Sequence, residues 1–528
     1  MKKSILAIAL LISSHVFSQT VEQGLKYIDI ERYTSAKNEF NKVLEKSPND
    51  ANALYYLGDL ALRDNDLTKA KEYFDKGVAA AHKNPLNYVG LGTIEWINGN
   101  ADAAKVKFDL ATSFGKRNAI MYYKIAEAYA KYEKKNYDLA VSILKEKALV
   151  YDRNMIDAHV LLGDIYLWQS NGSAAAENYN NALNVNPNSA KTLIRKGQIY
   201  VYSKNYTEGL NLFIKGVQAD STYSPGYREL GELYIKAGRP KEALENYKKF
   251  IERSDDDIKT KLNYGQFLYS AKDYLKSIEV LKNVQSQLDK PIINRILGYS
   301  YYETGDFNAA KNSLDAFFAK EDAKNFIALD YEYLGKSYAK LNNDSLAIIQ
   351  FDKAYSLDTS KVQLLSTIGD SYFKAKKYQK AAESYERFVN QRPKGFKELL
   401  SIGISYYLLK DQVKADTVLG KLIVAAPKSP SGYIWRARVK EQIDLGKTTP
   451  KLWLAKPFFE KFIELSKGDI TKYKAELLEA YSFMGYHFVS VKDCTNGLVY
   501  WNKVKEIDAT NKYALDNIKK CETSGAKK

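Results

Sequence analysis

Apolar residues recur with a helical period in two adjoining stretches between Ala328 and Lys361. In each stretch they fall three, four, seven or eight residues apart, which is the spacing that lines one face of an α-helix. They are Tyr331, Leu334, Gly335 and Tyr338 in the first stretch, and Ala347, Phe351, Ala354 and Tyr355 in the second. The polar run from Asn342 to Ser345 lies between the stretches and has the composition of a turn followed by a helix N-cap. The pattern therefore predicts a helical hairpin.

This hairpin is repeated along nearly the whole chain. A small residue equivalent to Gly335, called the marker below, recurs mostly at steps of 34 residues. The markers are Gly24, Gly58, Gly92, Ala126, Gly163, Gly197, Gly231, Gly265, Gly298, Gly335, Gly369, Gly403, Ala437 and Gly485. A single hairpin of this kind has apolar surface on both sides, so it is stable only when copies stack before and after it.

Three further positions are fixed relative to the marker. The residue three places later is usually Tyr, as at Tyr338; the residue twelve places later is small, as at Ala347; and the residue sixteen places later is usually aromatic, as at Phe351. This pattern covers about residues 17 to 511 and resembles the tetratricopeptide repeat family, whose period is 34 residues. The resemblance implies an all-α, right-handed superhelical α-solenoid of about 14 hairpins with a C-terminal capping helix.

The repeats also set the expected domain boundaries. We expect repeats 1 to 12 in residues 19–429, two divergent repeats in residues 430–511, and a capping helix and tail in residues 512–528. The divergent part contains an inserted loop from Ile443 to Trp453, and smaller insertions are expected at residues 132–137 and 321–324. Such a loop is either functional or a tolerated surface insertion.

Residues 1–18 have the pattern of a secretory signal peptide. Two lysines precede the apolar run of residues 5–12, and Val16-Phe17-Ser18 stands before Gln19. The apolar run is too short to span a bilayer as a permanent anchor. We therefore expect an exported bacterial protein of the periplasm, without a transmembrane anchor and at most peripherally associated with the outer membrane.

The net charge of +16 comes mostly from lysine. Lysine is a strongly hydrated point charge, whereas planar recognition of phosphate favours arginine. An excess of lysine is therefore typical of a soluble surface rather than of nucleic-acid binding. An acidic partner or the anionic surface of an envelope membrane stays open.

No catalytic or cofactor motif interrupts the repeats. The sequence has no P-loop, His-Glu-x-x-His or Cys-x-x-Cys motif, and His82, His159 and His487 fall in different repeats. We therefore expect a protein without enzymatic activity, cofactor or metal. Cys494 and Cys521 fall in the last repeat and the capping helix, where the sequence allows either a disulfide or two free thiols.

The resemblance implies that the first helix of each hairpin lines a concave groove. One residue after the marker, this face carries the acidic residues Asp59, Glu127, Asp164, Glu232 and Asp370. All but Asp164 precede a base by four residues, in the pairs Asp59 with Arg63, Glu127 with Lys131, Glu232 with Lys236 and Asp370 with Lys374. Such pairs either support their own helix or bind a mixed-charge peptide.

Aromatic residues recur on the same face, four or five places after the marker. They are Trp96, Trp168, Tyr202, Tyr269, Tyr302, Phe373 and Tyr407. These rings either pack between neighbouring first helices or form a binding surface, because Tyr and Trp combine a large contact area with few rotors.

Two function classes follow from these patterns. The first is an exported scaffold that binds a protein or peptide in the groove, as a component or assembly factor of a cell-envelope complex. The second is a carbohydrate or peptidoglycan binder, because aromatic rings also stack on sugars. Neither the repeats nor the fold they imply identify the partner.

Overall fold

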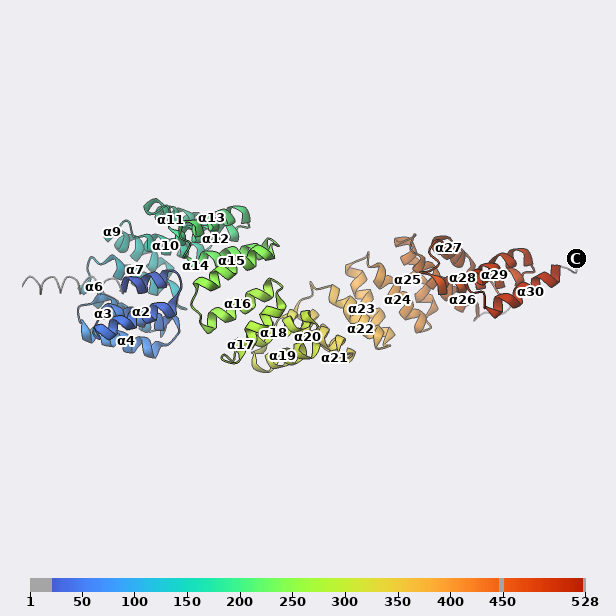
Figure 1. Cartoon of the computed structure of the whole chain (residues 1–528), viewed down its shortest axis with the longest axis horizontal. Helices are drawn as coiled ribbons and strands as arrows, with labels where there is room; N and C mark the ends of the chain where they lie inside the picture. Colours follow the sequence, from blue (N-terminus) through green and yellow to red (C-terminus); the bar gives the residue numbers. More distant parts are fainter. Residues whose placement is uncertain (1–20, 446–450, 526–528) are drawn as a thin grey trace, which may run out of the picture. The chain divides into compact units, whose positions relative to one another are not determined.

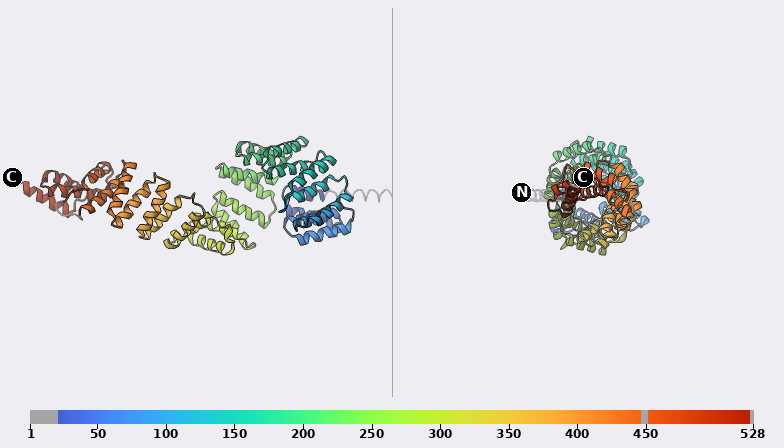
Figure 2. Two further views of the ribbon diagram at one scale, coloured as in Figure 1. Left: turned by 180° about the vertical axis from the view of Figure 1, so that it is seen from behind. Right: turned by 90° about the vertical axis from the view of Figure 1, so that its right-hand side faces the viewer.

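A computed structural model of the chain describes residues 21–445 and 451–525, and every regular element in these ranges is a helix. The helices follow one another as antiparallel hairpins, and within each of the two compact units described below successive hairpins stack on one another (Figures 1 and 2). The predicted all-α fold, with 14 hairpins and a C-terminal capping helix, is confirmed. The predicted signal peptide, residues 1–18, lies outside the described residues.

The chain divides into two compact units, residues 1–293 and 294–528. The sequence predicted one array from residue 19 to 429, whereas the boundary falls inside α18 (Pro291–Thr304), the first helix of the ninth hairpin. Periodicity could not reveal this boundary, because the repeat continues through it without a linker.

In the first unit, residues 21–29 are helical and pair with α2 (Tyr33–Lys46). The second to fourth hairpins are α3 (Ala51–Arg63) with α4 (Leu67–Ala80), α5 (Pro85–Ile97) with α6 (Ala101–Phe114), and α7 (Ala119–Lys131) with the segments α8 (Tyr137–Ile143), η1 (Leu144–Ala148) and α9 (Leu149–Tyr151). The fifth to eighth are α10 (Ile156–Trp168) with α11 (Gly172–Val185), α12 (Ala190–Tyr202) with α13 (Tyr206–Ala219), α14 (Ser224–Lys236) with α15 (Pro240–Arg253), and α16 (Ile258–Ser270) with α17 (Tyr274–Gln285).

The second unit contains the remaining hairpins. After α18 come α19 (Phe307–Lys320) and the short helix η2 (Ala323–Asn325), then α20 (Ala328–Lys340) with α21 (Asp344–Leu357) and α22 (Gln363–Lys374) with α23 (Tyr378–Gln391). The last hairpins are α24 (Phe396–Leu408) with α25 (Gln412–Ala425), α26 (Pro430–Leu445) with α27 (Lys456–Ser466), and α28 (Lys474–Ser490) with α29 (Cys494–Ile507), followed by the capping helix α30 (Lys512–Gly525).

The marker glycines allow the two helices of a hairpin to touch. A Cβ atom added to Gly335 would lie 2.7 Å from the ring of Phe351, the aromatic residue sixteen places later. The marker and the ring thus form a single contact, in which glycine leaves the space that the ring fills. The same contact joins Gly24 to Phe40, Gly58 to Phe74, Gly163 to Tyr179, Gly197 to Phe213, Gly369 to Tyr385 and Gly485 to Trp501.

We expect Gly335→Ala to lower the free energy of unfolding by about 1–3 kcal/mol, because the added methyl overpacks the contact with Phe351. Alanine is the better helix former, so propensity alone predicts the opposite sign. Hydrogen exchange of α20 and α21 measures the change. Gly172→Ala is the control, since its added Cβ would meet only one side-chain atom at 3.9 Å. Equal stability of the two variants would contradict this explanation of the marker.

In every hairpin except the fourth, the described turn places one residue in the left-handed region before the second helix. In the tenth hairpin this residue is Asn342, with φ of 60°, and Asn343 then caps α21 by accepting a hydrogen bond from the backbone N–H of Leu346 at 3.3 Å. The turn and N-cap predicted between Asn342 and Ser345 are confirmed. Gly99 and Gly238 occupy the left-handed position in two other hairpins, where glycine carries no steric cost.

The insertion in the fourth repeat is shared between two places. The predicted site, residues 132–136, holds a longer hairpin turn between α7 and α8. One further residue lies in the second helix, where η1 is a π-helix between α8 and α9. A π-turn accommodates an extra residue without ending the helix, so the inward faces on either side stay in register.

The insertion predicted at residues 321–324 lies between regular elements, whereas the loop predicted from Ile443 begins later, because α26 continues to Leu445. Residues 321–327 connect α19 to α20 and contain η2. In the thirteenth hairpin, residues 446–450 of the predicted loop lie outside the described residues. The loop's described ends are anchored, because the buried Asp444 carboxylate accepts hydrogen bonds from the backbone N–H groups of Leu452 (3.2 Å) and Leu454 (2.9 Å).

Candidate functional site

The first helices of the first unit carry a buried ionic cluster. Lys124 of α7 lies 3.2 Å from Asp59 of α3 and 2.8 Å from Glu127 of its own helix, and its side chain is 14% exposed. Burial alone raises the pKa of Glu127, but Lys124 and Lys131 outweigh it and hold the pKa well below the usual range. Burial likewise lowers the pKa of Lys124, whereas Asp59 and Glu127 raise it well above its usual value. The cluster therefore stays ionised at neutral pH. Its ion pairs hold first helices together rather than supplying an acid or a base.

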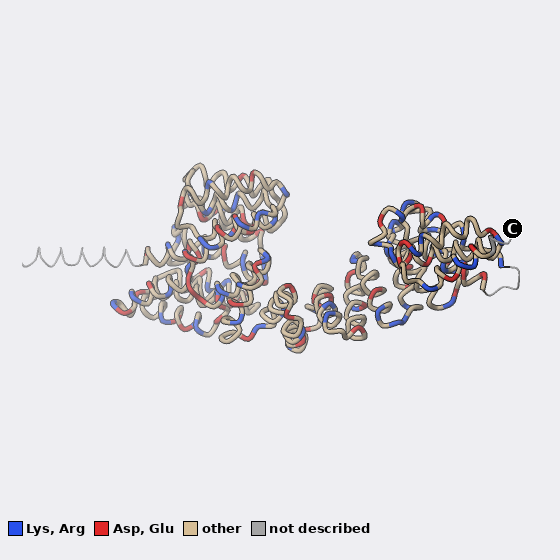
Figure 3. Tube along the Cα trace, turned by 45° about the vertical axis from the view of Figure 1, so that its right-hand side comes forward, with Lys and Arg blue, Asp and Glu red and all other residues tan. Residues whose placement is uncertain are grey.

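Two of the four acidic residues in the predicted pairs, Asp59 and Asp370, pair between repeats rather than within one helix. Of the four predicted pairs, only Glu127 with Lys131 forms among the described residues. Asp59 instead pairs with Lys124, and Asp370 accepts hydrogen bonds from Lys397 (2.6 Å) and the Tyr385 hydroxyl (2.7 Å). The helix-support interpretation is therefore wrong for Asp59 and Asp370, because first helices of later repeats bring opposite charges closer. Figure 3 shows the two signs of charge interspersed along the chain.

The first hairpin also contacts the sixth and seventh hairpins, far away in the sequence. The Asp255 carboxylate, 7% exposed in the loop between α15 and α16, accepts hydrogen bonds from the backbone N–H groups of Thr34 (2.7 Å) and Ser35 (3.3 Å). It also accepts from the Ser35 hydroxyl at 2.5 Å and pairs with Arg32 at 3.3 Å. Asp255 thus caps α2 across about 220 residues of sequence.

Three more contacts flank this cap. Arg228 of α14 pairs with Glu31 at 2.6 Å; Ser224 donates to the Ile30 carbonyl at 2.9 Å; and Lys191 of α12 pairs with Asp29 at 2.9 Å. Residues 29–35 with Lys191, Ser224, Arg228 and Asp255 are called the closing seam below. The seam joins the turn before α2 to α14 within the first unit (Figure 1). Its contacts link residues more than 150 positions apart, so the repeat pattern could not predict it.

The predicted groove aromatics have different environments. Trp96 is only 6% exposed and packs edge-on against Tyr129, with ring centroids 4.7 Å apart, so it is a core residue in this structure. Trp168 and Tyr202 are 45% and 72% exposed. All three belong to the first unit.

Three other predicted rings lie over the turn of their own hairpin. Tyr269, Tyr302 and Phe373 each contact the aromatic residue that begins the second helix, at centroid distances of 5.8, 5.5 and 5.4 Å. Those partners are Tyr274, Phe307 and Tyr378. Tyr302 also contacts Tyr333 of the next first helix at 5.4 Å, and Tyr407 contacts Trp435 of its next first helix at 5.6 Å. Tyr269 belongs to the first unit and the other three to the second, so the predicted row crosses the unit boundary.

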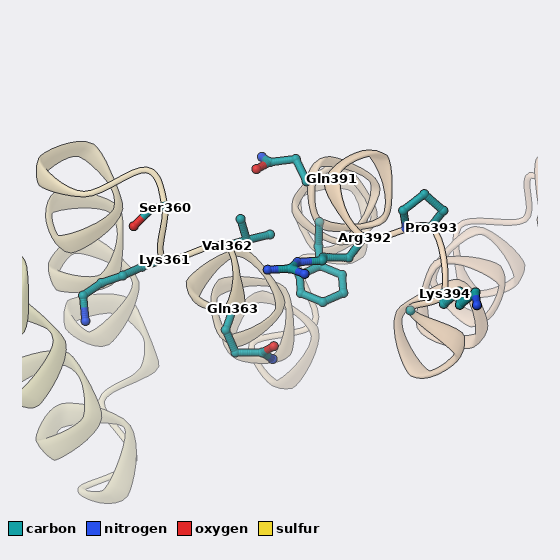
Figure 4. A pocket seen from close by; sticks show the side chains of 10 residues that line it. Ser360, Lys361, Val362, Gln363, Gln391, Arg392, Pro393 and Lys394 are labelled. Carbon is teal, nitrogen blue, oxygen red and sulfur yellow. The ribbon is translucent and has the colours of Figure 1, made fainter. Parts of the chain in front are cut away.

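The second unit has a cavity that the sequence analysis did not predict. Its volume is about 710 Å³, and it lies between the loop from α21 to α22 and the loop from α23 to α24 (Figure 4). Val362, Phe388 and Pro393 supply apolar surface, and Arg392 and Lys394 supply positive charge. The segment Arg392-Pro393-Lys394-Gly395 was the available signal, because it has no Asp or Asn, unlike most loops between hairpins.

The C-terminal end of the second unit is joined covalently. Cys494 at the start of α29 and Cys521 in α30 form a disulfide, with Cα atoms 5.3 Å apart. The bond ties the capping helix to the last hairpin. Of the two arrangements that the sequence allowed, the structure therefore contains the bonded one.

The inserted loop of the thirteenth hairpin ends in an aromatic cluster. Trp453 contacts His487 of α28 at 4.6 Å between ring centroids, and the Lys451 ammonium lies 4.4 Å from the Trp453 ring. Burial lowers the pKa of His487, and the nearby Lys456 and Lys451 act in the same direction. The residue is therefore held neutral by packing.

The described residues also bear on metal binding and on membrane insertion. In residues 21–445 and 451–525, no three His, Cys, Asp or Glu side chains are arranged to hold a metal ion. Within the same ranges, no helix combines the length and apolarity that a membrane span requires.

Sequence comparison identifies repeats in both units. Profiles described as tetratricopeptide repeat match residues 21–85, 226–257, 365–395 and 399–429. A TPR repeat-containing protein of Methanocaldococcus jannaschii is 24% identical over 244 residues, which are 44% of this chain and 42% of that protein. Tetratricopeptide repeat protein 21A of Mus musculus is 29% identical over 212 residues, or 39% of this chain and 16% of that protein. The chain thus spans less than half the length of these curated relatives.

Solved structures with similar helical repeats also match. The C-terminal part of a TPR repeat-containing protein from Cytophaga hutchinsonii is 30% identical, and the match covers 49% of this chain and 99% of that one, with a TM-score of 0.43. A chain of the APC/C hetero-tetramer Cut9–Hcn1 is 14% identical, with coverage of 94% and 95% and a TM-score of 0.30.

Proposed function

Because the chain belongs to the tetratricopeptide repeat family, we propose that it is an exported, non-catalytic scaffold that binds a protein or peptide through the first helices of its second unit. We place this role in the cell envelope, as a component or assembly factor of a complex there. Repeat solenoids present extended surfaces built from successive first helices, which suits binding to a chain-like partner.

One observation carries this proposal. In the second unit, half-buried rings and ion pairs form a row across α22, α24, α26 and α28, called the first-helix row below. Phe373, Tyr407 and Trp435 pack on one core cluster. The ion pair between Asp370 and Lys397 joins α22 to α24 with side chains 47% and 60% exposed, and the pair between Arg438 and Glu479 joins α26 to α28 at 2.6 Å. The row thus offers both charges and aromatic surface to a partner.

The first unit is less suited to this role. Its first helices are occupied by the Lys124 cluster, and the closing seam joins the first hairpin to the seventh. Charges that already pair inside a protein must be separated before they can bind a ligand, which costs free energy. The ion pairs of the first-helix row are more exposed than the Lys124 cluster, so separating them costs less.

Phe373→Ala combined with Tyr407→Ala is expected to weaken binding of a captured partner by at least 1 to 2 kcal/mol, the lower range for aromatic hot spots. Biolayer interferometry with the immobilised chain measures the dissociation constant, and circular dichroism reports the helical content. Tyr206→Ala is the matched control, because this exposed ring lies on a second helix. Unchanged binding with an earlier thermal transition would make the two rings packing residues and contradict the proposed surface.

Export has a direct test at the N-terminus. The protein isolated from its native envelope is expected to begin at Gln19 or its cyclised form, because cleavage is predicted after Ser18. Mass spectrometry of the N-terminal peptide measures this. An intact Met1 on the envelope-associated protein would contradict the proposed localisation.

A further inference from the structure

Arg392 stands where five other loops between hairpins carry a residue that stabilises the turn. In these loops the equivalent residue is Asp or Asn, and its side chain accepts a hydrogen bond from the backbone N–H two residues later. These residues are Asp152, Asn186, Asp220, Asp358 and Asp508. Arginine has no acceptor, so the loop at Arg392 gives up this hydrogen bond.

The guanidinium of Arg392 extends into the cavity, between the segment Val362-Gln363 and Gln391 (Figure 4). Three carboxylates in this region already have partners. They are Glu332 with Lys361 at 2.7 Å, Glu398 with Ser366 at 2.6 Å and Asp358 with Ser360 at 2.6 Å. Within the described ranges, the side chains of Arg392 and Lys394 make no hydrogen bond or ion pair. The cavity therefore has two cations without a counter-charge.

The rest of the lining is suited to an apolar group. Val362, Phe388 and Pro393 face the same space, whose volume of about 710 Å³ is large enough for several side chains. Lys361 is a third cation on the rim but is held by Glu332. The cavity thus combines an apolar wall with two free positive charges on one loop.

From this combination we infer that the cavity binds an acidic peptide segment, with a carboxylate at the Arg392 guanidinium, Lys394 adding positive charge further along the same loop, and an apolar side chain against Val362, Phe388 and Pro393. The inference rests on the proposed protein-binding function and names the chemistry of the partner. Guanidinium and carboxylate groups match in charge and in bidentate geometry, which is the reason for choosing an acidic partner.

Fluorescence polarisation with the full chain tests this inference. The probe is a fluorescein-labelled octapeptide of alternating Asp and Leu. We expect Arg392→Asp with Lys394→Ala to weaken its binding at least tenfold, because both counter-charges are lost. Asp at position 392 restores the turn residue of the other loops, so this variant is expected to keep its fold. Lys428→Ala is the matched control, because it removes a cation from the next loop and is expected to leave binding unchanged.

Two further peptides test each half of the inferred site. The Asn-Leu analogue lacks the charges and the Asp-Gly analogue lacks the apolar groups, and each is expected to bind at least tenfold more weakly than the Asp-Leu peptide. The inference would be overturned if the Asn-Leu analogue bound as tightly as the Asp-Leu peptide. It would also be overturned if Lys428→Ala weakened peptide binding as much as Arg392→Asp with Lys394→Ala does. A third contradicting result would be that Arg392→Asp with Lys394→Ala weakens binding to phosphatidylglycerol vesicles but leaves binding of the peptide unchanged.

The peptide assay is independent of the test of the first-helix row. If the Asp-Leu peptide fails to bind while the captured partner still depends on Phe373 and Tyr407, only the cavity inference is wrong. If the peptide binds through Arg392 but capture does not depend on those rings, the proposed first-helix surface is wrong and the cavity inference stands.

Discussion

Replacing Asp255 by alanine is expected to open the closing seam and to lower the free energy of local unfolding of the first hairpin by about 2–4 kcal/mol. The carboxylate is 7% exposed and accepts hydrogen bonds from Thr34 and Ser35 while it pairs with Arg32. Its removal combines the loss of a helix N-cap with the loss of a buried ion-pair partner. Hydrogen exchange of residues 21–46 measures the change.

Asp256→Ala is the matched control for this prediction. The neighbouring carboxylate is 87% exposed and pairs with Lys261 at 2.9 Å. An exposed pair of this kind contributes about 0–1 kcal/mol, so this variant should exchange like the wild type. If residues 21–46 are as protected from hydrogen exchange in Asp255→Ala as in the wild type, the seam does not hold the first hairpin in place.

The second large effect is expected from the disulfide. Cys494→Ser with Cys521→Ser removes a bond that closes 27 residues of sequence separation, which contributes about 3.5 kcal/mol in the chain-entropy model. The loss should be concentrated in α29 and α30, because these helices end the second unit and pack mainly on each other and on α28. Urea unfolding monitored by hydrogen exchange of these helices measures it.

Reduction provides the control for the disulfide variant. Wild-type protein in dithiothreitol should unfold like the double serine variant, and the variant itself should not respond to the reductant. Titration of two free thiols in the unreduced, unfolded protein would contradict the presence of the bond.

The repeat architecture was predictable because it depends on contacts within one hairpin. Gly335 and Phe351 lie sixteen residues apart and touch, so the spacing between marker and ring records the packing itself. The same locality explains why the insertion at residues 321–324 was found from a single irregular step between markers.

The closing seam and the charge pairs depend on contacts between repeats, which spacing does not record. Asp255 meets Thr34 only because the hairpins of the first unit curve round to bring them together. For the same reason, Asp59 pairs with Lys124, two repeats away, rather than with Arg63 in its own helix. Curvature is a sum of small rotations between hairpins, and the sequence pattern gives no value for it.

The aromatic positions were found, but their roles were not. Trp96 is buried, whereas Tyr202, on the equivalent face of a later repeat, is 72% exposed. The difference comes from neighbouring repeats, since Trp96 packs on Tyr129 of α7. The position of a residue within its repeat therefore predicts the helix face on which the residue lies better than it predicts the exposure of the side chain.

The central claim is that this chain works by holding a protein partner on the first-helix row, and cross-linking in the intact envelope tests it most directly. Affinity capture after treatment with a lysine-reactive cross-linker, followed by mass spectrometry, should give one reproducible protein partner. Its cross-links should include Lys397 of the row and should diminish with Phe373→Ala and Tyr407→Ala. Retention of the chain on isolated cell wall, with no protein cross-linked to Lys397, would contradict the claim and favour carbohydrate binding.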